Sequence, residues 1–296
     1  MGKIKISEAV SKGKVLISDG AWGTFLQKKG LKPGECPELW CIDRPSDVLD
    51  IAKSYIDAGA DMIETNSFGG TSFKLQHYGL ENRVMEINEA SAKISRKAAG
   101  ENKWVIASVG PTGKMLIMGD VTEEELYNAF KDQAIALEKG GADAICIETM
   151  SDIDEATIAI KAVRENTKCE IICTFTFDKT VQGDYKTMMG FSPTETIKAA
   201  LEAGADIVGA NCGNGILRMI DIVKEIRTVS KTIPVLVHAN AGLPQMIDGK
   251  DFFPDTPEMM GEQVKNLVAA GANIIGVCCG TTPAHIKAMK EAVSAL

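Results

Sequence analysis

Short apolar segments alternate with amphipathic segments along this chain, and the alternation predicts its fold. One phrase recurs four times: AGADMIETNSFGG at 58–70, GGADAICIETMSD at 140–152, AGADIVGANCGNG at 203–215 and AGANIIGVCCGTT at 270–282. In each copy, a glycine that can end a helix precedes a short apolar run. Four more apolar runs alternate with these copies: KVLISDG at 14–20, WVIASVG at 104–110, EIICTFTF at 170–177 and IPVLVHAN at 233–240. We expect eight β-strands, because near-continuous apolar runs suit a parallel sheet that is covered on both faces.

Between these runs, apolar residues recur at intervals of three and four, which predicts amphipathic helices. The expected helices cover residues 46–59, 122–140, 154–166, 192–204, 216–230, 256–271 and 282–296. Ser or Thr precedes several of these helix starts, as N-cap residues do. Eight strands alternating with helices in 296 residues predict one (β/α)8 TIM barrel domain over residues 1–296. An open, doubly wound parallel sheet is the structural alternative.

The carboxyl ends of the expected strands are polar. In a barrel these ends meet at one mouth, which is where such folds place their chemistry. In chain order they are Asp19–Gly20, Glu64–Thr65–Asn66, Ser108–Gly110, Glu148–Thr149, Thr176, Asn211–Cys212, His238–Asn240 and Cys278–Cys279. This set is too polar for a packed core layer, so we expect a functional site there.

Composition narrows the classes of partner. The net charge is −8 and the sequence contains no basic cluster, which argues against nucleic acid and anionic membranes. No apolar run approaches the roughly 18 residues that span a bilayer, and the first residues do not form a signal peptide. We therefore expect a cytoplasmic protein. Its eight cysteines are then reduced thiols or metal ligands and not a disulfide framework.

Three cysteines fall at strand ends that the barrel brings together. Cys212 ends the sixth expected strand, and the adjacent pair Cys278–Cys279 ends the eighth. Three thiolates with one exchangeable position are typical of a catalytic zinc site. Neighbouring residues on a regular strand point to opposite faces, so the pair can share one ion only where the chain leaves strand geometry, which Gly280 permits. Packing and a redox pair remain alternatives from spacing alone.

The remaining cysteines and histidines have simpler interpretations. Cys146, Cys169 and Cys173 lie on apolar strands and are expected to pack, whereas Cys36 and Cys41 lie in the long first loop. His238 precedes the HANAG motif within a strand and is expected to be structural, or to lie just outside the site. His77 and His285 are expected at the solvated surface. Thr282 and Pro283 predict a helix start, with anion binding at that helix as a rival use.

Together these motifs carry a specific resemblance. DGAWGT at 19–24, ETNSFGG at 64–70, GANCGNG at 209–215, HANAG at 238–242 and GVCCGTTP at 276–283 occur in this order. From about residue 12 to the C-terminus, the chain resembles the homocysteine S-methyltransferase family. It is most similar to the homocysteine-binding module of cobalamin-dependent methionine synthase, because CCGTTP resembles that branch.

The resemblance implies a zinc-binding barrel and assigns roles to residues of this sequence. It implies that Cys212, Cys278 and Cys279 bind Zn²⁺, with Asn240 as a fourth ligand before substrate displaces it. It implies that homocysteine is bound by Glu148, which holds the amino group, and by Asp19 with the Gly20–Ala21 turn. Ser108 and Asn211 are added to this substrate set. No protein residue is expected to carry the methyl group.

The implied reaction is attack of the zinc-bound homocysteine thiolate on an activated methyl group, giving methionine. Since this sequence contains no cobalamin-binding motif, a methylcorrinoid donor would arrive on a separate protein or domain. We expect the mouth loops 24–45 and 240–257, including Phe252 and Phe253, to contact that partner, although both rings could equally pack locally. The alternatives are betaine, S-methylmethionine or another methyl donor, a non-catalytic zinc- or thiol-binding protein, and a phosphate-ligand barrel enzyme.

Overall fold

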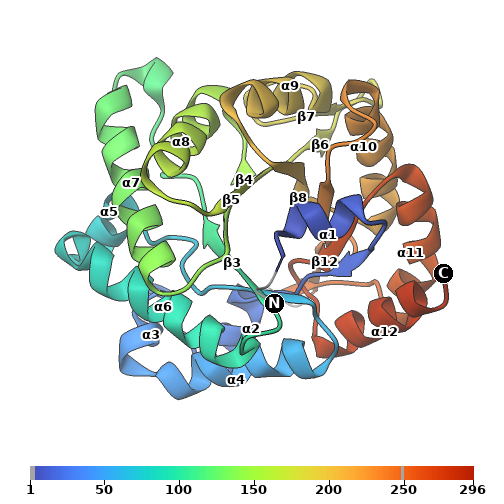
Figure 1. Cartoon of the computed structure of the whole chain (residues 1–296), viewed down its shortest axis with the longest axis horizontal. Coiled ribbons are helices and arrows are strands. Elements are labelled where there is room, and N and C mark those ends of the chain that lie inside the picture. Colours follow the sequence, from blue (N-terminus) through green and yellow to red (C-terminus); the bar gives the residue numbers. More distant parts are fainter. Residues whose placement is uncertain (1–3, 248–249) are drawn as a thin grey trace.

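The computed structural model describes residues 4–247 and 250–296, and its main sheet is an eight-stranded parallel barrel (Figure 1). The barrel strands are β1 (Leu16–Ile17), β2 (Met62–Glu64), β3 (Trp104–Val109), β4 (Ala144–Met150), β5 (Glu170–Phe175), β8 (Ile207–Gly215), β9 (Val235–Asn240) and β12 (Ile274–Val277). Their spatial order is β1-β12-β9-β8-β5-β4-β3-β2, so neighbours in space are neighbours in the series. This order confirms the predicted (β/α)8 barrel in place of a doubly wound sheet.

Helices surround the barrel. They are α1 (Ile6–Ser11), α2 (Gly23–Lys28), α3 (Trp40–Asp43), α4 (Pro45–Asp57), α5 (Ser72–Leu75), α6 (Val84–Ala99), α7 (Glu123–Lys139), α8 (Ile153–Asn166), α9 (Pro193–Ala203), α10 (Ile216–Val229), α11 (Pro257–Ala270) and α12 (Pro283–Ser294). Short 3₁₀ turns cover Gln76–Tyr78, Glu81–Arg83 and Leu116–Met118. Two hairpins extend from the mouth loops: β6 (Asp178–Lys179) with β7 (Tyr185–Lys186), and β10 (Gln245–Ile247) with β11 (Lys250–Phe252).

All eight predicted strands and all seven predicted helices are present, whereas the short helices α1, α2, α3 and α5 and the long helix α6 were not predicted. The buried face of α6 is mixed, because Asn88, Ser91 and Ser95 lie there among apolar residues. Ser95 Oγ donates to Glu64 O at 2.7 Å and Asn88 Nδ2 donates to Gly70 O at 2.8 Å. These polar side chains bind the loop behind strand β2, so the helix lacks the apolar stripe on which the prediction relied.

The recurring Ala-Asp or Ala-Asn of the fourfold phrase joins neighbouring strands. The side chains of Asp61, Asp143, Asp206 and Asn273 accept hydrogen bonds from the backbone N–H groups of Ile17, Val105, Ile171 and Val235, at 2.7–3.0 Å. The backbone N–H of each of these four residues donates to the carbonyl oxygen of the same partner. At the seam between β1 and β2, these bonds close the barrel where no regular ladder forms.

The side chains inside the barrel change from apolar to polar along its axis. Strand residues alternate between the outer helices and the barrel interior. The interior positions at the amino end are apolar: Leu16, Met62, Trp104, Ile106, Ala144, Cys146, Ile172, Ile207, Leu236 and Ile274. The next inward positions along the same strands are Ser18, Glu64, Ser108, Glu148, Thr174, Gly209, His238 and Gly276, and Asn211 follows Gly209 on β8. The same alternation of inward and outward side chains therefore gives the barrel a packed apolar floor at the amino ends of the strands and a polar mouth at their carboxyl ends.

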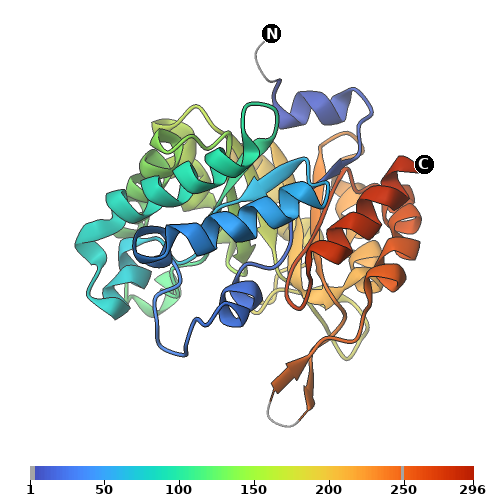
Figure 2. The same cartoon turned by 90° about the horizontal axis from the view of Figure 1, so that it is seen from below.

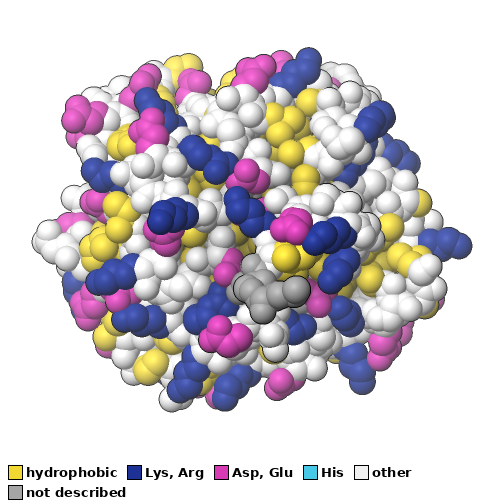
Figure 3. Space-filling model, viewed as in Figure 1, with side chains coloured by type: hydrophobic (Ala, Val, Ile, Leu, Met, Phe, Trp, Pro, Cys, Tyr) yellow, Lys and Arg dark blue, Asp and Glu magenta, His cyan; other side chains and the backbone are white. Residues whose placement is uncertain are grey.

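Helix α1 closes the floor of the barrel (Figures 1 and 2). Ile6, Ala9 and Val10 pack into the apolar floor, and the Glu170 carboxylate accepts the backbone N–H groups of Ile6 and Ser7. On this face basic and acidic side chains are intermixed, without a large area of one sign (Figure 3). The β10–β11 hairpin projects at the opposite end (Figure 2). Within the described residues, no helix has the length and apolar character needed to span a membrane.

Candidate active site

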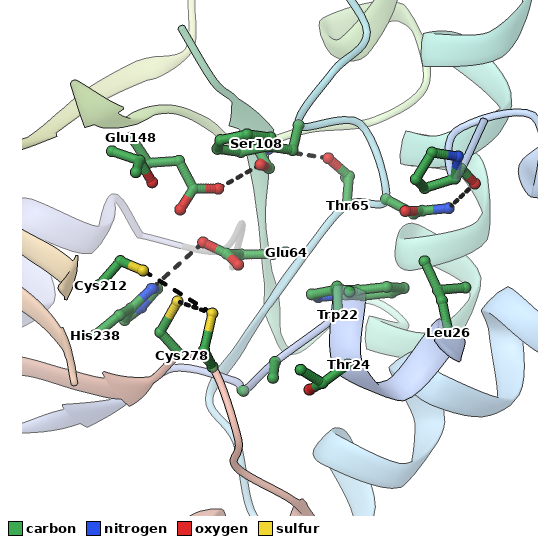
Figure 4. A pocket seen from close by; sticks show the side chains of 18 of the residues that line it. Trp22, Thr24, Leu26, Glu64, Thr65, Ser108, Glu148, Cys212, His238 and Cys278 are labelled. Carbon is green, nitrogen blue, oxygen red and sulfur yellow. Dashed lines mark hydrogen bonds and ion pairs between the residues drawn. The ribbon is translucent and has the colours of Figure 1, made fainter. Parts of the chain in front are cut away.

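A cavity of about 330 Å³ occupies the mouth of the barrel. Three groups of side chains line it: thiols, carboxyl groups, and an apolar and aromatic wall from the segment after β1 (Figure 4). The lining residues are Gly20, Ala21, Trp22, Gly23, Thr24, Leu26, Pro37, Glu38, Glu64, Thr65, Asn66, Ser67, Phe68, Ser108, Glu148, Thr149, Cys212, His238, Val277, Cys278 and Cys279. The loop 24–45, expected to contact a partner, thus also forms part of the cavity wall.

The structure brings the three predicted thiols together on one side of this cavity. Cys279 Sγ lies 3.9 Å from both Cys212 Sγ and Cys278 Sγ, and all three sulfurs lie within 4.8 Å of one another. Two departures from strand geometry allow this. Cys212 has a left-handed backbone with φ 57°, and Gly280 turns the chain after the pair with φ +82°. A non-glycine residue with positive φ is uncommon and is often found at functional sites.

Hydrogen bonds connect the thiols to each other and to Asn240. Donation from Cys278 and Cys279 lowers the pKa of Cys212 to about 3, and the hydrogen bond to Cys212 contributes most to raising the pKa of Cys279 to about 12. Asn240 Oδ1 accepts the backbone N–H of Cys279 at 3.1 Å, and its side chain also forms a hydrogen bond with Cys212. Asn240 therefore orients the cluster, and its role as a fourth ligand stays a prediction.

Glu148 is held rigidly in the cavity wall by residues that the sequence analysis placed at the site. Ser108 Oγ donates to Glu148 Oε1, and Asn211 Nδ2 donates to Oε2 at 3.0 Å. Asn211 Oδ1 also accepts the backbone N–H of Thr149, whose φ is 61°. Burial raises the pKa of Glu148 to about 7, and the charges of Asp19 and Cys212 add to this effect. Asn211 is itself buried behind Glu148, so it supports that residue and does not line the cavity.

Asp19 lies beneath the cavity surface, fully buried. Its Oδ2 accepts Trp22 Nε1 and the backbone N–H of Glu64, each at 2.9 Å, and burial raises its pKa to about 7. The Gly20–Ala21 turn does line the cavity. A Cβ atom at Gly20 would lie 2.7 Å from the ring of Tyr55, so only glycine fits there. The structure thus places Asp19 as a support for the turn and for Glu64.

Glu64 and His238 are two ionisable residues of the cavity wall that were not assigned to substrate from the sequence. Both are buried and line the cavity, with His238 Nδ1 3.5 Å from Glu64 Oε1 (Figure 4). Burial lowers the pKa of His238 to about 4 and, with the charges of Glu148 and Asp19, raises that of Glu64 well above its usual value. The repeat contained a signal for Glu64, because the sequence Ile-Glu-Thr ends the strand in both copies, three residues after Asp61 for Glu64 and five residues after Asp143 for Glu148.

The other expectations have mixed outcomes. The prediction of a solvated His285 is wrong: this residue is buried, and its Nδ1 accepts the backbone N–H of Thr282 at 3.1 Å. Thr282 and Pro283 do begin helix α12, as predicted. Of the two expected partner-contact rings, Phe252 is half-exposed, whereas Phe253 packs against Gly280. Cys146, Cys169 and Cys173 are buried as expected, and His77 is exposed as expected. Cys36 and Cys41 are also buried, and Cys41 lies in helix α3 and not in a loop.

Comparison with known proteins finds a matching family model and related sequences. A family model described as homocysteine S-methyltransferase matches residues 16–293. The methionine synthase of Mycobacterium tuberculosis is 30% identical over 295 residues, covering 95% of this chain and 25% of that protein. The methionine synthase of Mycobacterium leprae is 29% identical, covering 95% of this chain and 24% of that protein. The chain therefore spans about a quarter of the length of these relatives.

Solved structures support the same fold. The metallated form of the homocysteine methyltransferase MmuM from Escherichia coli matches with a TM-score of 0.78 at 22% identity, covering 96% of this chain and 98% of that one. Its apo form matches with a TM-score of 0.75 at 21% identity, covering 96% and 97%. At this level of identity, the comparison shows the shared barrel alone.

Proposed function

Because the chain belongs to the homocysteine S-methyltransferase family, we propose that it transfers a methyl group to the sulfur of homocysteine at a zinc ion, giving methionine. One observation carries this proposal: three thiols and a buried carboxyl group face one cavity at the barrel mouth. A protein that only binds zinc does not need the carboxyl group, and a phosphate-binding barrel does not need the thiols.

The spacing of the thiols fits a zinc ion. Zinc–sulfur bonds of about 2.3 Å in a tetrahedron place two sulfur ligands about 3.8 Å apart. The Sγ atom of Cys279 lies 3.9 Å from those of Cys212 and Cys278. All three residues are only partly buried and line the cavity, so a substrate sulfur can reach the same place. Three protein ligands with one open position are typical of catalytic zinc.

Zinc, when bound, would hold the substrate sulfur as a thiolate, which is the nucleophilic form. Side chains of this protein would bind the rest of the substrate, orient it and exclude water. Glu148 would accept the substrate ammonium group, and Ser108 and Asn211 would keep its carboxylate in place. Asp19 would fix the Gly20–Ala21 turn beside the amino-acid end of the substrate. Trp22 and Leu26, on the wall opposite the thiols, would exclude water from the cavity (Figure 4).

For the methyl donor we propose a methylcorrinoid held by another protein or domain. The similarity to methionine synthases about four times as long supports this choice, as does CCGTTP. A second observation that supports a donor on another protein is a set of exposed apolar side chains, here called the apolar rim. It consists of Ile117, Met118, Val181, Met188 and Met246. Among the described residues, these are the large apolar side chains more than 70% exposed. All five lie in the loops after β3, β5 and β9, at the end of the barrel that carries the cavity.

The proposal is tested by measuring bound zinc and the formation of methionine from homocysteine with three donors: methylcobalamin, betaine and S-methylmethionine. We expect about one zinc per chain and transfer from methylcobalamin. Transfer from betaine or S-methylmethionine instead would change the proposed methyl donor and leave the proposed zinc-thiolate site unaffected. A protein that binds no zinc and transfers methyl groups from none of the donors would overturn the proposed function.

A further inference from the structure

The carboxyl groups at the mouth differ in how fully their oxygens are hydrogen-bonded. Both oxygens of Glu148 accept hydrogen bonds, as do both oxygens of Asp19 and of Glu38. Glu64 Oε1, in contrast, is buried without a hydrogen-bond partner, and its neighbour His238 Nδ1 lies 3.5 Å away. No other carboxyl oxygen in the described part of the chain is buried without a hydrogen bond. A buried, unpaired polar atom costs free energy, so such an atom in a cavity wall indicates a missing ligand group.

The place of Glu64 shows what that group could contact. Its carboxyl group lies between Glu148 on one side and the sulfurs of Cys212 and Cys278 on the other (Figure 4). The Glu64 backbone is fixed, because its N–H donates to Asp19 Oδ2 at 2.9 Å. Glu64 ends strand β2, and its side chain lines the same cavity as that of Glu148. The two carboxyl groups therefore face one space beside the thiols.

The charges around this space favour a cation. Glu38, Glu64 and Glu148 line the cavity, Asp19 lies beneath it, and neither lysine nor arginine is among the lining residues. The negative charges of Glu148 and Asp19 disfavour ionisation of Glu64, adding to the effect of burial. A positive group between the carboxylates would offset both effects. An ammonium group, with three N–H donors, can bind two carboxylates at once.

We propose that Glu64 is a second binding residue for the substrate ammonium group, which it shares with Glu148, so that the pair selects thiols that carry an α-amino group. This inference rests on the proposed function. A divalent cation held by Asp19, Glu64 and His238 is the rival occupant, since one ligand atom of each lies within 4.8 Å of the others. Asp19 Oδ2 already accepts two N–H groups, which favours the ammonium group.

The test measures binding of two thiols by calorimetry: L-homocysteine and 4-sulfanylbutanoate, which lacks the amino group. We expect Glu64→Gln to raise the Kd for homocysteine about 10- to 100-fold, because one charge-assisted contact is lost. The Kd for 4-sulfanylbutanoate should stay the same or fall. Glu64→Asp, which keeps a shorter carboxylate, should recover part of the affinity for homocysteine. Glu170→Gln serves as the matched control at the barrel floor and should change neither Kd.

The other possible results contradict either the role of Glu64 or the proposed function. Unchanged binding of homocysteine by Glu64→Gln, or an equal loss for both thiols, would overturn the role of Glu64. A second metal ion that is bound by the wild type and absent from Glu64→Gln would show that the Glu64 carboxyl group binds a metal ion and not an ammonium group. If Glu64→Gln does not fold, the ratio of the two Kd values in Glu64→Asp replaces it, and an unchanged ratio refutes the proposal. A wild type that binds neither thiol would refute the proposed function itself.

Discussion

The two ends of the barrel are built from the same strands and use the same residue types in opposite ways. At the floor, the carboxylate of Glu170 accepts the Ile6 N–H at 2.6 Å and the Ser7 N–H at 3.1 Å. At the mouth, Glu64 keeps an unpaired oxygen and Glu148 faces a cavity. A carboxylate that the fold encloses with its donors stabilises the fold, whereas one that faces a cavity can accept a further donor from a ligand.

The cysteines show the same contrast. Cys146 lies in the apolar floor, where burial raises its pKa well above the ordinary value and keeps it a neutral thiol. Cys212 lies on strand β8 and lines the mouth cavity, in a left-handed backbone, with its sulfur 3.9 Å from that of Cys279. Position along the barrel axis therefore decides whether a cysteine packs or is available to a metal. Five substitutions test this contrast.

The largest effect is expected from removing one thiol at the mouth. Cys212→Ala should lose bound zinc and reduce methyl transfer at least about 1000-fold, because the metal contributes several kcal/mol to such reactions. The fold should be retained, since Cys212 is not part of the core. Zinc content, activity and circular dichroism measure these outcomes.

Cys146→Ala is the matched change at the floor. It should retain zinc and activity while lowering the free energy of unfolding, because it leaves a small cavity in a packed interior. The contrast between the ends would be refuted by a Cys212→Ala protein of full activity, or by loss of zinc in Cys146→Ala.

The next effect separates substrate binding from metal binding. Glu148→Ala should retain zinc and raise KM for homocysteine about 10- to 100-fold, because a hydrogen bond to a charged group contributes about 1.5–3 kcal/mol. Steady-state kinetics with a zinc assay on the same sample measures both quantities. An unchanged KM would remove Glu148 from the substrate site.

A smaller effect is expected at the floor, on stability alone. Glu170→Gln leaves the first N–H groups of helix α1 without their charged acceptor, and should lower the free energy of unfolding by about 1–3 kcal/mol. KM for homocysteine and zinc content should stay the same. Urea unfolding followed by fluorescence gives the change in stability. A change in KM would show that the two ends are coupled.

The smallest effect is a pH dependence that only the mouth should produce. Burial raises the pKa values of Asp19 and Glu148 to about 7, so their contribution to stability is present below pH 4 and is lost as the pH rises to about 7. His238, whose pKa burial lowers to about 4, acts oppositely between about pH 4 and 6.5, because only the unfolded chain binds its proton there.

The pKa of a third mouth carboxyl group, that of Glu64, is also raised by burial. Three mouth carboxyl groups against one histidine leave a net fall in the stability of the zinc-free protein between about pH 5 and 7. Glu148→Gln should make this slope less negative by up to about 1.4 kcal/mol per pH unit. Glu170→Gln should leave the slope as in the wild type. Urea titrations at several pH values would contradict the account if both variants had the same slope.

Much of the architecture could be predicted from the sequence, because buried strands and amphipathic helices have distinct periodicities. Helix α6 was not predicted, because Asn88, Ser91 and Ser95 interrupt its apolar stripe. Asn88 and Ser95 donate hydrogen bonds to the backbone carbonyl oxygens of Gly70 and Glu64. The fourfold phrase was visible as a repeat. Its physical role, side chains that bind the backbone of the preceding strand, depends on contacts across about 40 residues that no local pattern reveals.

The site was predicted in part for the same reason. The three thiols and Glu148 could be placed at one mouth, because the barrel brings strand ends together whatever their distance in sequence. Asp19 and Asn211 were expected to meet substrate, but the structure buries both behind residues that line the cavity. Glu64 was not assigned to substrate, because an unpaired oxygen is a property of three-dimensional packing. His285 was predicted to be solvated because it lies in an amphipathic helix, and the sequence did not reveal the hydrogen bond that its side chain accepts from Thr282.

The central claim is that Cys212, Cys278 and Cys279 hold one zinc ion to which the homocysteine sulfur is added. X-ray absorption at the zinc edge, on the protein with and without homocysteine, tests this most directly, because it counts the sulfur atoms bound to the metal. The account predicts three sulfur ligands without homocysteine and four with it. A sulfur count that does not change when homocysteine binds, or a protein that holds no zinc, would contradict it.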